Sequence, residues 1–396
     1  MVPFYGPGGK NLCEIRAAEG PEGRNNFSHG PFWGIFTPAP YPKGPMTPSS
    51  PHQPAADAPS LLVIRFGSLG DLCVLSWTLA RLADTAGSAR PRVTLVTKPA
   101  FAPLMDHARG IDEVVVLTGA GIAAVTRLAK ELRRRKWDRV IDAHNILRGH
   151  LLLGMMGRRP DRRLAKDTAA RLAFMRFGRK SAELERTMHD RFAELTVDDQ
   201  AAGASKSEIV PPLASLATAR PGDENISILG LAPGAQWETK RWPEKNFAAV
   251  VENWLADHGG GRAEIFLGPR EMDWFPGSAL DDLAHNEDRI EVVAGRDLTE
   301  VAMRLARCSR LVTNDSGLLH IAEAVGTPVL ALFGPTVREF GYFPILARSL
   351  VLEKSLDCRP CSRNGKRPCH RGDLACLQDI TPDAVRSVLA SLEENT

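Results

Sequence analysis

The stretch LVTNDSGLLH, residues 311–320, contains a strand, a turn and the start of a helix within ten positions. Leu-Val-Thr is typical of a short buried strand, NDSG of a polar turn, and the apolar spacing from Leu318 onward of a helix. A helix that opens directly after a strand leaves backbone N–H groups free at its N-terminus, where they can bind an anion. The turn also carries Asp315 and Ser316, so this strand end is a candidate ligand site.

Two interpretations of these residues stay open at this point. Asp315 and Ser316 stand where their side chains either cap the first helical amides or reach the hydroxyls of a ligand. His320, one helical turn further on, is either a core histidine with satisfied hydrogen bonds or a part of the same site. Because helix caps are common, this segment alone does not decide between the two.

Strands and helices alternate on both sides of the stretch, which predicts an α/β protein with parallel sheets covered on both faces. The length of 396 residues fits two Rossmann-like halves, 60–222 and 223–396, with a cleft between them. Ligands of open α/β sheets bind beyond the carboxyl ends of strands, where GSLGD (67–71), PGAQWETK (233–240) and NDSG (314–317) all fall. The expected strands are 61–66, 92–97, 112–117, 139–143, 226–232, 263–268, 290–295, 310–314 and 329–334, and the expected helices are 72–84, 125–136, 247–259, 298–308 and those that start near 148, 277, 318 and 382.

Residues 1–59 are rich in Gly, Pro, Ser and Asn, lack periodicity and are predicted to be a disordered extension. Met46 lies shortly before the first strand, so a start of translation there is a hypothesis. Residues 211–225 are predicted to be a linker. Because we find neither a run of 18 apolar residues nor a signal-peptide pattern, we expect a cytoplasmic protein without transmembrane helices.

Positive charge is concentrated in the first half of the chain. Residues 60–199 contain 25 Lys and Arg against 16 Asp and Glu, a net charge of +9, so that the total of +3 leaves −6 for the remainder. Two clusters, 127–139 and 148–180, contribute most of the excess. A basic half indicates an anionic partner, and a nucleic acid, a membrane surface and a phosphorylated acceptor all fit this description.

Two residues in the glycine-containing turns are candidates either for chemistry or for ordinary structural roles. Asp71 ends the turn GSLGD and is either a helix N-cap, which is the commoner role, or a general base. Lys240 ends the loop that contains Gly234, and its charge either contacts a phosphate or is solvated. The first turn lacks the G-x-G-x-x-G spacing, so a nicotinamide cofactor is only weakly supported.

The seven cysteines are too few for a disulfide scaffold at this chain length. Four of them lie within 358–376 as Cys358-x2-Cys361-x7-Cys369-x6-Cys376. A CxxC pair is a good half of a zinc site, but the second pair is widely spaced. A structural zinc site, reduced thiols and a disulfide remain the alternatives.

Four motifs occur in a fixed order, RFGSLGD (65–71), PGAQWETKRWPEKNF (233–247), NDSGLLHIAEAVGTPVLALFGPT (314–336) and CRPC…C…CLQDITP (358–382). Together they resemble the heptosyltransferases of glycosyltransferase family 9, and the resemblance covers residues 60–390. It implies a GT-B fold in which the first Rossmann-like domain binds the acceptor and the second binds the nucleotide sugar. It further implies inverting transfer of heptose from ADP-heptose to the inner core of a lipopolysaccharide precursor, with no required metal or other cofactor.

The resemblance also implies roles for single residues. Asp71 becomes the catalytic base, in place of a helix cap, because a single-displacement transfer needs a base on the acceptor side. Lys240 would neutralise the departing diphosphate, which needs cationic or N–H stabilisation. Arg148, just beyond the strand at 139–143, is the candidate acceptor-binding residue. The implied donor-binding residues are Gly234, Lys240, Glu271, Asp315, Ser316, Gly317 and His320, with Glu271 as a ribose-binding carboxylate.

The implied partners are a nucleotide sugar and a lipid-linked, anionic oligosaccharide, and no nucleic acid is expected. The basic stretches 133–136 and 158–163 would contact phosphates and carboxylates of that acceptor, or the anionic cytoplasmic leaflet of the inner membrane. Three alternatives remain: a family 9 enzyme that uses another nucleotide sugar for a different cell-surface glycan, a nucleotide-dependent oxidoreductase, and a non-catalytic zinc- or nucleic-acid-binding module. The last of these leaves two complete α/β halves unexplained.

Overall fold

The computed structural model describes residues 53–196, 210–217 and 226–393 of the chain. Most of the predicted N-terminal extension, with Met46, lies outside these residues, and its disorder stays a prediction. The second half of the predicted linker, 218–225, lies outside them as well.

The described residues 53–59 show that the predicted extension reaches too far. The Ala55 backbone N–H donates to the Ser88 carbonyl at 3.1 Å, and the Arg92 N–H donates to the Pro59 carbonyl at 2.8 Å. Because Arg92 is the first residue of a strand, these bonds hold the segment against the first sheet. The prediction of disorder is therefore wrong for 53–59.

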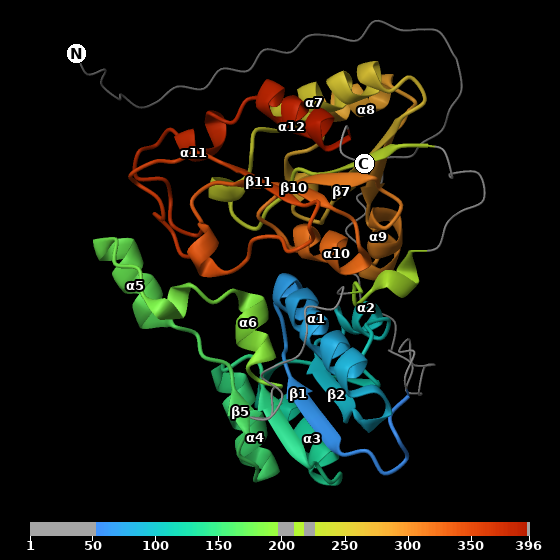
Figure 1. Cartoon of the computed structure of the whole chain (residues 1–396), viewed down its shortest axis with the longest axis vertical. Helices are drawn as coiled ribbons and strands as arrows, with labels where there is room; N and C mark the ends of the chain where they lie inside the picture. The colour runs from blue at the N-terminus through green and yellow to red at the C-terminus, as the bar shows by residue number, and fades with distance from the viewer. Residues whose placement is uncertain (1–52, 197–209, 218–225, 394–396) are drawn as a thin grey trace, which may run out of the picture. The chain divides into compact units, whose positions relative to one another are not determined.

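The first sheet has five parallel strands in the order β3-β2-β1-β4-β5. Figure 1 labels β5, β1 and β2 of this sheet. Helices connect successive strands, as parallel pairing requires. The strands are β1 (Ser60–Ile64), β2 (Arg92–Thr97), β3 (Glu113–Val116), β4 (Arg139–Asp142) and β5 (Arg162–Arg163), and the helices are α1 (Leu69–Ala86), α2 (Ala102–Met105), α3 (Gly121–Arg133), α4 (Leu147–Met156), α5 (Thr168–Phe177) and α6 (Met188–Ala193).

The second sheet has six parallel strands in the order β11-β10-β9-β6-β7-β8. The predicted class, two parallel sheets with helices, is thereby confirmed. The strands are β6 (Ile228–Ala232), β7 (Arg262–Leu267), β8 (Ile290–Ala294), β9 (Arg310–Asn314), β10 (Val329–Phe333) and β11 (Leu350–Glu353), and the helices are α7 (Glu244–Asp257), α8 (Ala279–Asn286), α9 (Leu298–Leu305), α10 (Gly317–Val325), α11 (Ala375–Gln378) and α12 (Pro382–Glu393).

Each sheet reverses its strand order at one point, and ligands of such sheets bind at these points. In the first sheet β1 lies between β2 and β4, so the chain leaves β1 in one direction and returns on its other side at β4. In the second sheet the corresponding pair is β6 and β9, with Ala232 opposite Thr313. The turns GSLGD, PGAQWETK and NDSG follow β1, β6 and β9, which places all three at reversal points.

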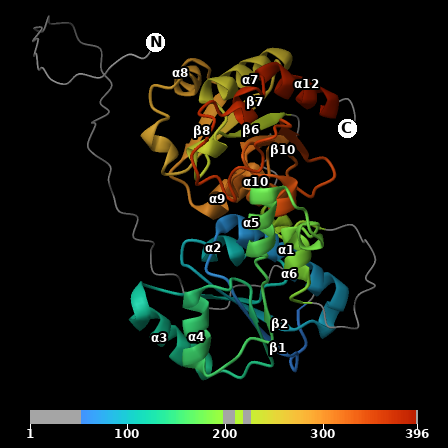
Figure 2. The same cartoon turned by 90° about the vertical axis from the view of Figure 1, so that its left-hand side faces the viewer.

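Helix α1 is buried on every side along its first three turns. All residues from Gly70 to Ala80 are buried, because the helix packs on the first sheet and also contacts α6 and α10 (Figure 2). The core around it is continuous between the halves and includes Val63 of β1 together with Leu311 of β9 and Phe333 of β10. Contact between α1 and α10 therefore fixes the two reversal points relative to each other.

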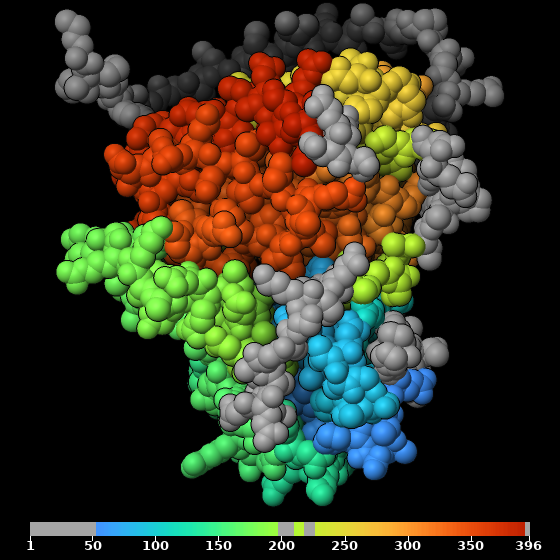
Figure 3. All heavy atoms as spheres, in the orientation of Figure 1, coloured from blue at the N-terminus to red at the C-terminus, as the bar shows by residue number. Residues whose placement is uncertain are grey.

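Helix α5 belongs to the first half in sequence but packs against the second half (Figure 3). Phe174 is buried against Phe340, and the Arg171 guanidinium donates to the Phe340 carbonyl at 3.2 Å. An ion pair joins Lys180 to Glu339 on the same stretch. The division into domains at residue 222 stays a prediction, and α5 shows that the first half reaches across it.

Candidate active site

The first turns of α1 and α10 approach each other through glycine residues. A Cβ added to Gly70 would stand 2.6 Å from the His320 ring, and one added to Gly317 would stand 3.2 Å from the Leu69 side chain. Because real Cβ atoms essentially never come within 3.0 Å of other atoms, the contact between Gly70 and His320 requires a glycine at position 70. This contact brings Asp71 of α1 and His320 of α10 into one site.

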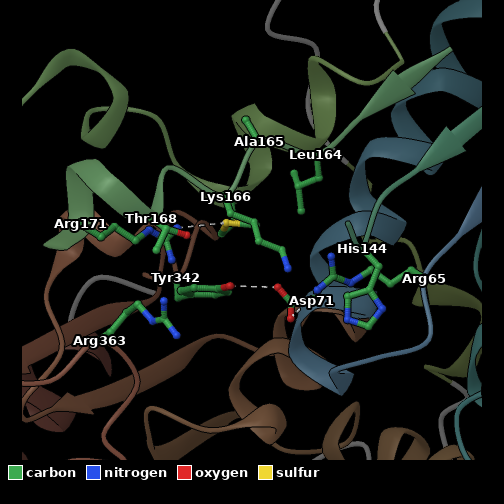
Figure 4. A pocket seen from close by; sticks show the side chains of 11 residues that line it. Arg65, Asp71, His144, Leu164, Ala165, Lys166, Thr168, Arg171, Tyr342 and Arg363 are labelled. Carbon is green, nitrogen blue, oxygen red and sulfur yellow. Dashed lines mark hydrogen bonds and ion pairs between the residues drawn. The ribbon is translucent and has the colours of Figure 1, made fainter. Parts of the chain in front are cut away.

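Asp71 is a buried carboxylate with three side-chain partners. Its Oδ2 lies 2.6 Å from the Arg65 guanidinium and accepts a hydrogen bond of 2.6 Å from the Ser68 hydroxyl. Its Oδ1 accepts a hydrogen bond of 3.0 Å from the Tyr342 hydroxyl (Figure 4). The N-cap residue of α1 is Ser68, so the interpretation of Asp71 as a helix cap is wrong.

These partners keep Asp71 ionised. Burial by itself raises the pKa of this carboxyl, but the Arg65 charge and the hydroxyl donors Ser68 and Tyr342 outweigh it, so the pKa lies below its ordinary value. Oδ2 is occupied by two partners, whereas Oδ1 has one, and a carboxylate oxygen accepts two hydrogen bonds. Oδ1 is therefore the oxygen with capacity for another donor.

A cavity of about 370 Å³ opens beside this carboxylate. Among the described residues that line it, Asp71 is the one acid, and the cations come from four different segments. Figure 4 shows Lys166 extending toward Asp71 from one wall and Arg363 standing beside Tyr342 on the other. Such a cavity suits an anionic molecule that presents a hydroxyl to Asp71. The lining cations are Arg65, Lys166, Arg171 and Arg363.

His320 stands on the Asp71 side of the site. Its ring meets the Tyr342 ring edge-on, with 6.1 Å between the centroids. Burial lowers the pKa of His320, although the nearby charges of Asp315 and Asp71 oppose this shift. A neutral His320 packed on Tyr342 supports the phenol that binds Asp71.

The Lys240 charge is paired and not solvated, so the interpretation as a solvated loop charge is wrong. Its Nζ lies 2.5 Å from Asp315 Oδ2, which also accepts a hydrogen bond of 2.6 Å from the Thr336 hydroxyl. The Asn314 side-chain amide donates to the Pro233 carbonyl at 2.7 Å and thereby joins the Lys240 loop to the turn after β9. The two loops at the second reversal point thus form one unit.

Helix α10 begins without a side-chain cap. Its N-cap residue is Ser316, and within the described part of the chain the Ser316 hydroxyl accepts no hydrogen bond from a helical amide. The interpretation of this turn as an ordinary capped helix is therefore wrong. The first amides of a nine-residue helix stay available to an anion, with Lys240 and Asp315 beside them.

Gly234 and Glu271, predicted from different motifs, lie against each other. A Cβ on Gly234 would come within 2.3 Å of one carboxylate oxygen of Glu271, and a Cβ on Gly268 would come within 2.7 Å of the other. The carboxylate thus sits between the loops after β6 and β7, with 9% of the residue exposed. This position fits a carboxylate that accepts hydrogen bonds from the hydroxyl groups of a ligand.

Arg148 does not line the cavity that contains Asp71. It lies on the first turn of α4, exposed, in the wall of a second cavity with Leu147 and Leu151. Sequence reasoning missed Tyr342 and Arg363, for which the sequence gives no motif signal. It also missed Arg65, although this residue lies only two positions before the GSLGD turn.

The cysteine-containing segment packs on the Lys240 loop. The Thr239 hydroxyl donates to the Gly365 carbonyl, and a Cβ on Gly365 would stand 2.8 Å from the Lys240 side chain. In the described residues we find no three His, Cys, Asp or Glu side chains arranged to hold a metal ion, and a structural zinc site at the four cysteines stays a prediction. No disulfide is formed here, since Cys358, Cys361, Cys369 and Cys376 are free thiols.

We expect Tyr342→Phe to raise the pKa of Asp71. The substitution removes a hydrogen bond that stabilises the ionised carboxylate, and this bond is among the causes that lower the pKa. Titration of the Asp71 carboxyl carbon by NMR measures the shift. Ser76→Ala is the matched control, because that hydroxyl donates to the Cys73 carbonyl in the same helix and does not touch Asp71. An unchanged Asp71 pKa in Tyr342→Phe would show that the bond does not form in solution.

Known sequences resemble this chain. A model of glycosyltransferase family 9, described as heptosyltransferase, matches residues 125–370, a range that does not include Asp71. The lipooligosaccharide heptosyltransferase 2 of Haemophilus ducreyi is 31% identical over 190 residues, which cover 47% of this chain and 53% of that protein. The chain spans about half the length of the first curated relatives that it matches.

Solved structures share the fold. The E. coli ADP-heptose lipopolysaccharide heptosyltransferase II superposes with a TM-score of 0.64 at 21% identity, covering 85% of this chain and 100% of that chain. The E. coli heptosyltransferase WaaC with ADP-2-deoxy-2-fluoro heptose gives 0.62 at 21% identity, with the same two coverages. The predicted GT-B fold is thereby confirmed.

Proposed function

Because the chain belongs to glycosyltransferase family 9, the heptosyltransferase family, we propose that it transfers heptose from ADP-heptose to the inner core of a lipopolysaccharide precursor, with inversion. One observation carries the proposal. The contact between α1 and α10 sets an ionised, buried carboxylate, Asp71, beside an uncapped helix N-terminus that has Lys240 next to it. An acceptor base and an anion site in one place are what a single displacement at a sugar phosphate needs.

On the acceptor side, Asp71 Oδ1 takes the proton of the attacking hydroxyl. The hydroxyl oxygen forms its bond to the anomeric carbon while the bond from that carbon to the diphosphate breaks, which inverts the anomeric configuration. Lys166, Arg171 and Arg363 bind phosphates or carboxylates of the acceptor in the 370 Å³ cavity. Tyr342 shares Oδ1 with the acceptor and orients the carboxylate.

On the donor side, the first amides of α10 and the Lys240 ammonium bind the diphosphate, so Lys240 exchanges Asp315 for the ligand. Glu271 accepts hydrogen bonds from the ribose hydroxyls, and Gly234, which has no side chain, leaves room for that carboxylate beside the loop after β6. The negative charge that develops on the departing ADP meets fixed dipoles and a cation. Ser316 and Gly317 contribute backbone amides, and His320 supports Tyr342.

This chemistry uses side chains and backbone amides alone, so we propose that no metal cofactor is required. Transfer should then persist in excess EDTA. In the described part of the chain we find no helix that could cross a membrane. Because the proposed acceptor is lipid-linked, we place the reaction at the cytoplasmic face of the inner membrane, with the protein bound peripherally. Arg148 would contact the acceptor at the second cavity, outside the reacting centre.

Ligand-induced stabilisation tests the donor. ADP-heptose at 100 times its Kd should stabilise the protein by about 2.7 kcal/mol, which a thermal-shift assay detects. Other ADP-sugars and UDP- and GDP-sugars, at the same concentration, should give smaller shifts. A larger shift with another nucleotide sugar would replace ADP-heptose as the donor and would favour a different cell-surface glycan as the product. A shift with a nicotinamide dinucleotide and none with any nucleotide sugar would contradict the transferase proposal.

A further inference from the structure

The second cavity is apolar and lies open at the surface. It has a volume of about 470 Å³ and is formed by the first turns of α3 and α4, which pack side by side. Figures 1 and 2 both show these helices next to each other. Arg148 is the one charged residue among the described residues that line it.

Three large apolar side chains at this cavity are exposed to water. The exposed fractions are 66% for Ile122, 73% for Leu147 and 38% for Leu151, and we call these residues the α3–α4 apolar surface. Residues 118–123, which lead into α3 and form its first turn, are all exposed and carry no charge. Contiguous apolar surfaces of this kind mark contacts with a partner or a membrane.

The surroundings of the α3–α4 apolar surface are strongly basic. Residues 121–163 contain twelve Lys and Arg against four Asp and Glu, a net charge of +8. On the two helices and the loop after them, Arg127, Lys130, Arg148 and Arg158 are exposed. Apolar side chains surrounded by exposed cations complement a surface that is apolar inside and anionic outside.

The α3–α4 apolar surface lies at the carboxyl ends of the strands of the first sheet, the same end at which the candidate active site is found. Strand β4 ends at Asp142, and two residues further on His144 lines the Asp71 cavity. The chain then enters α4, where Leu147 and Arg148 line the second cavity. A lipid-linked molecule that reached Asp71 would therefore have its lipid end near this edge.

We propose that the α3–α4 apolar surface binds an anionic lipid bilayer. Ile122, Leu147 and Leu151 enter the boundary between headgroups and acyl chains, and the surrounding arginine and lysine side chains contact the headgroups. The orientation turns toward the membrane the part of the first sheet's carboxyl edge where α3 and α4 begin. The inference rests on the proposed function only in that a lipid-linked acceptor would come from such a bilayer.

Sedimentation with lipid vesicles tests the inference without any sugar substrate, so a failure of the proposed transferase activity leaves the result readable. The full chain should bind vesicles of phosphatidylethanolamine and phosphatidylglycerol at least about tenfold more tightly than vesicles of phosphatidylcholine alone. The double variant Ile122→Ser/Leu147→Ser should lower the partition coefficient on the anionic vesicles by at least about tenfold, because two apolar side chains no longer leave water.

Two matched pairs complete the design. Met272→Ser/Met303→Ser, at side chains that are 45% and 40% exposed in the second half, should leave vesicle binding unchanged. Leu172→Ser/Phe177→Ser changes the exposed apolar residues of α5, at 61% and 66%, and should also leave it largely intact. Loss of binding confined to the α5 pair would overturn the proposal. Absence of vesicle binding by the parent chain would also overturn it. So would a parent chain that is dimeric and becomes monomeric in Ile122→Ser/Leu147→Ser, because a second copy of the chain would then be the occupant of the surface. Unchanged melting temperatures show that all variants fold.

Discussion

Asp71→Asn is expected to lower kcat about 10³-fold and to leave the KM for the nucleotide sugar nearly unchanged. The amide keeps the shape of the carboxylate but cannot take the proton of the acceptor hydroxyl. The proposed donor contacts are made by the first amides of α10 and by Lys240, and none of them uses the Asp71 carboxylate, so nucleotide binding is retained. Steady-state kinetics with saturating acceptor separate the two parameters.

Asp112→Asn provides the matched control. Asp112 is also a carboxylate held by an arginine, since Arg90 donates two hydrogen bonds of 2.7 Å to it, but it lies outside the cavity. Its substitution should lower the melting temperature and spare kcat. If Asp71→Asn retained more than about a tenth of the parental kcat, the base would have to be another residue.

The pKa of Asp71 also predicts the pH dependence. Because this pKa lies below its ordinary value, the base is ionised at neutral pH and stays so on acidification. The loss of kcat/KM that comes from protonation of the base should therefore occur only below about pH 4, where an ordinary aspartate titrates. A fall in kcat/KM with an apparent pKa near neutrality would point to a different titrating group.

The regular strands could be predicted because their sequences carry local patterns. RVTLVT gives β2 at Arg92–Thr97 with the predicted bounds, and Thr381 caps the last helix as expected, since its hydroxyl accepts the Ala384 N–H at 3.2 Å. The two-residue strand Arg162–Arg163 has no apolar residue and no period to detect. The helix expected from about 148 ends at Gly157, where φ is 67° and a glycine is favoured.

The predicted linker, 211–225, shows that local composition can also miss a buried segment. Its first part looks like a loop in sequence, yet Leu213 is fully buried and its N–H donates to the Ala324 carbonyl at 2.8 Å. That environment is made by α10, about a hundred residues further along the chain. Local composition cannot report a contact of this range.

Some residues of the candidate site could be predicted from the sequence and others could not. Lys240 and Asp315 each stand in a turn after a strand, and the rule for reversal points brings them together. Tyr342 does not directly follow a strand. It reaches the site because α10 packs against α1 and because the chain after β10 passes over this contact, where Tyr342 meets Asp71 and His320. Arg363 depends on the packing of the cysteine-containing segment over Lys240, which no residue pattern encodes.

Lys240→Met is expected to lower kcat by a factor of about 10² to 10³, because the departing diphosphate loses its cation at the moment its charge develops. The affinity for ADP should fall as well, since ADP carries the same diphosphate, and isothermal titration measures it. Methionine keeps the packing of the side chain against Gly365 while it removes the charge. The Thr336 hydroxyl remains on Asp315, so the loss of the ion pair leaves that carboxylate with one donor.

Two comparisons isolate the charge. Lys245→Met, in the same motif but at an exposed position of α7, should leave kcat and ADP affinity unchanged. The double variant Lys240→Met/Asp315→Asn removes both members of the pair, so it should recover any stability lost by Lys240→Met and recover none of the activity. Recovery of activity in the double variant would mean that Lys240 acts only by neutralising Asp315. Full activity of Lys240→Met would remove this lysine from the donor site and leave the first amides of α10 as its only proposed source of positive charge.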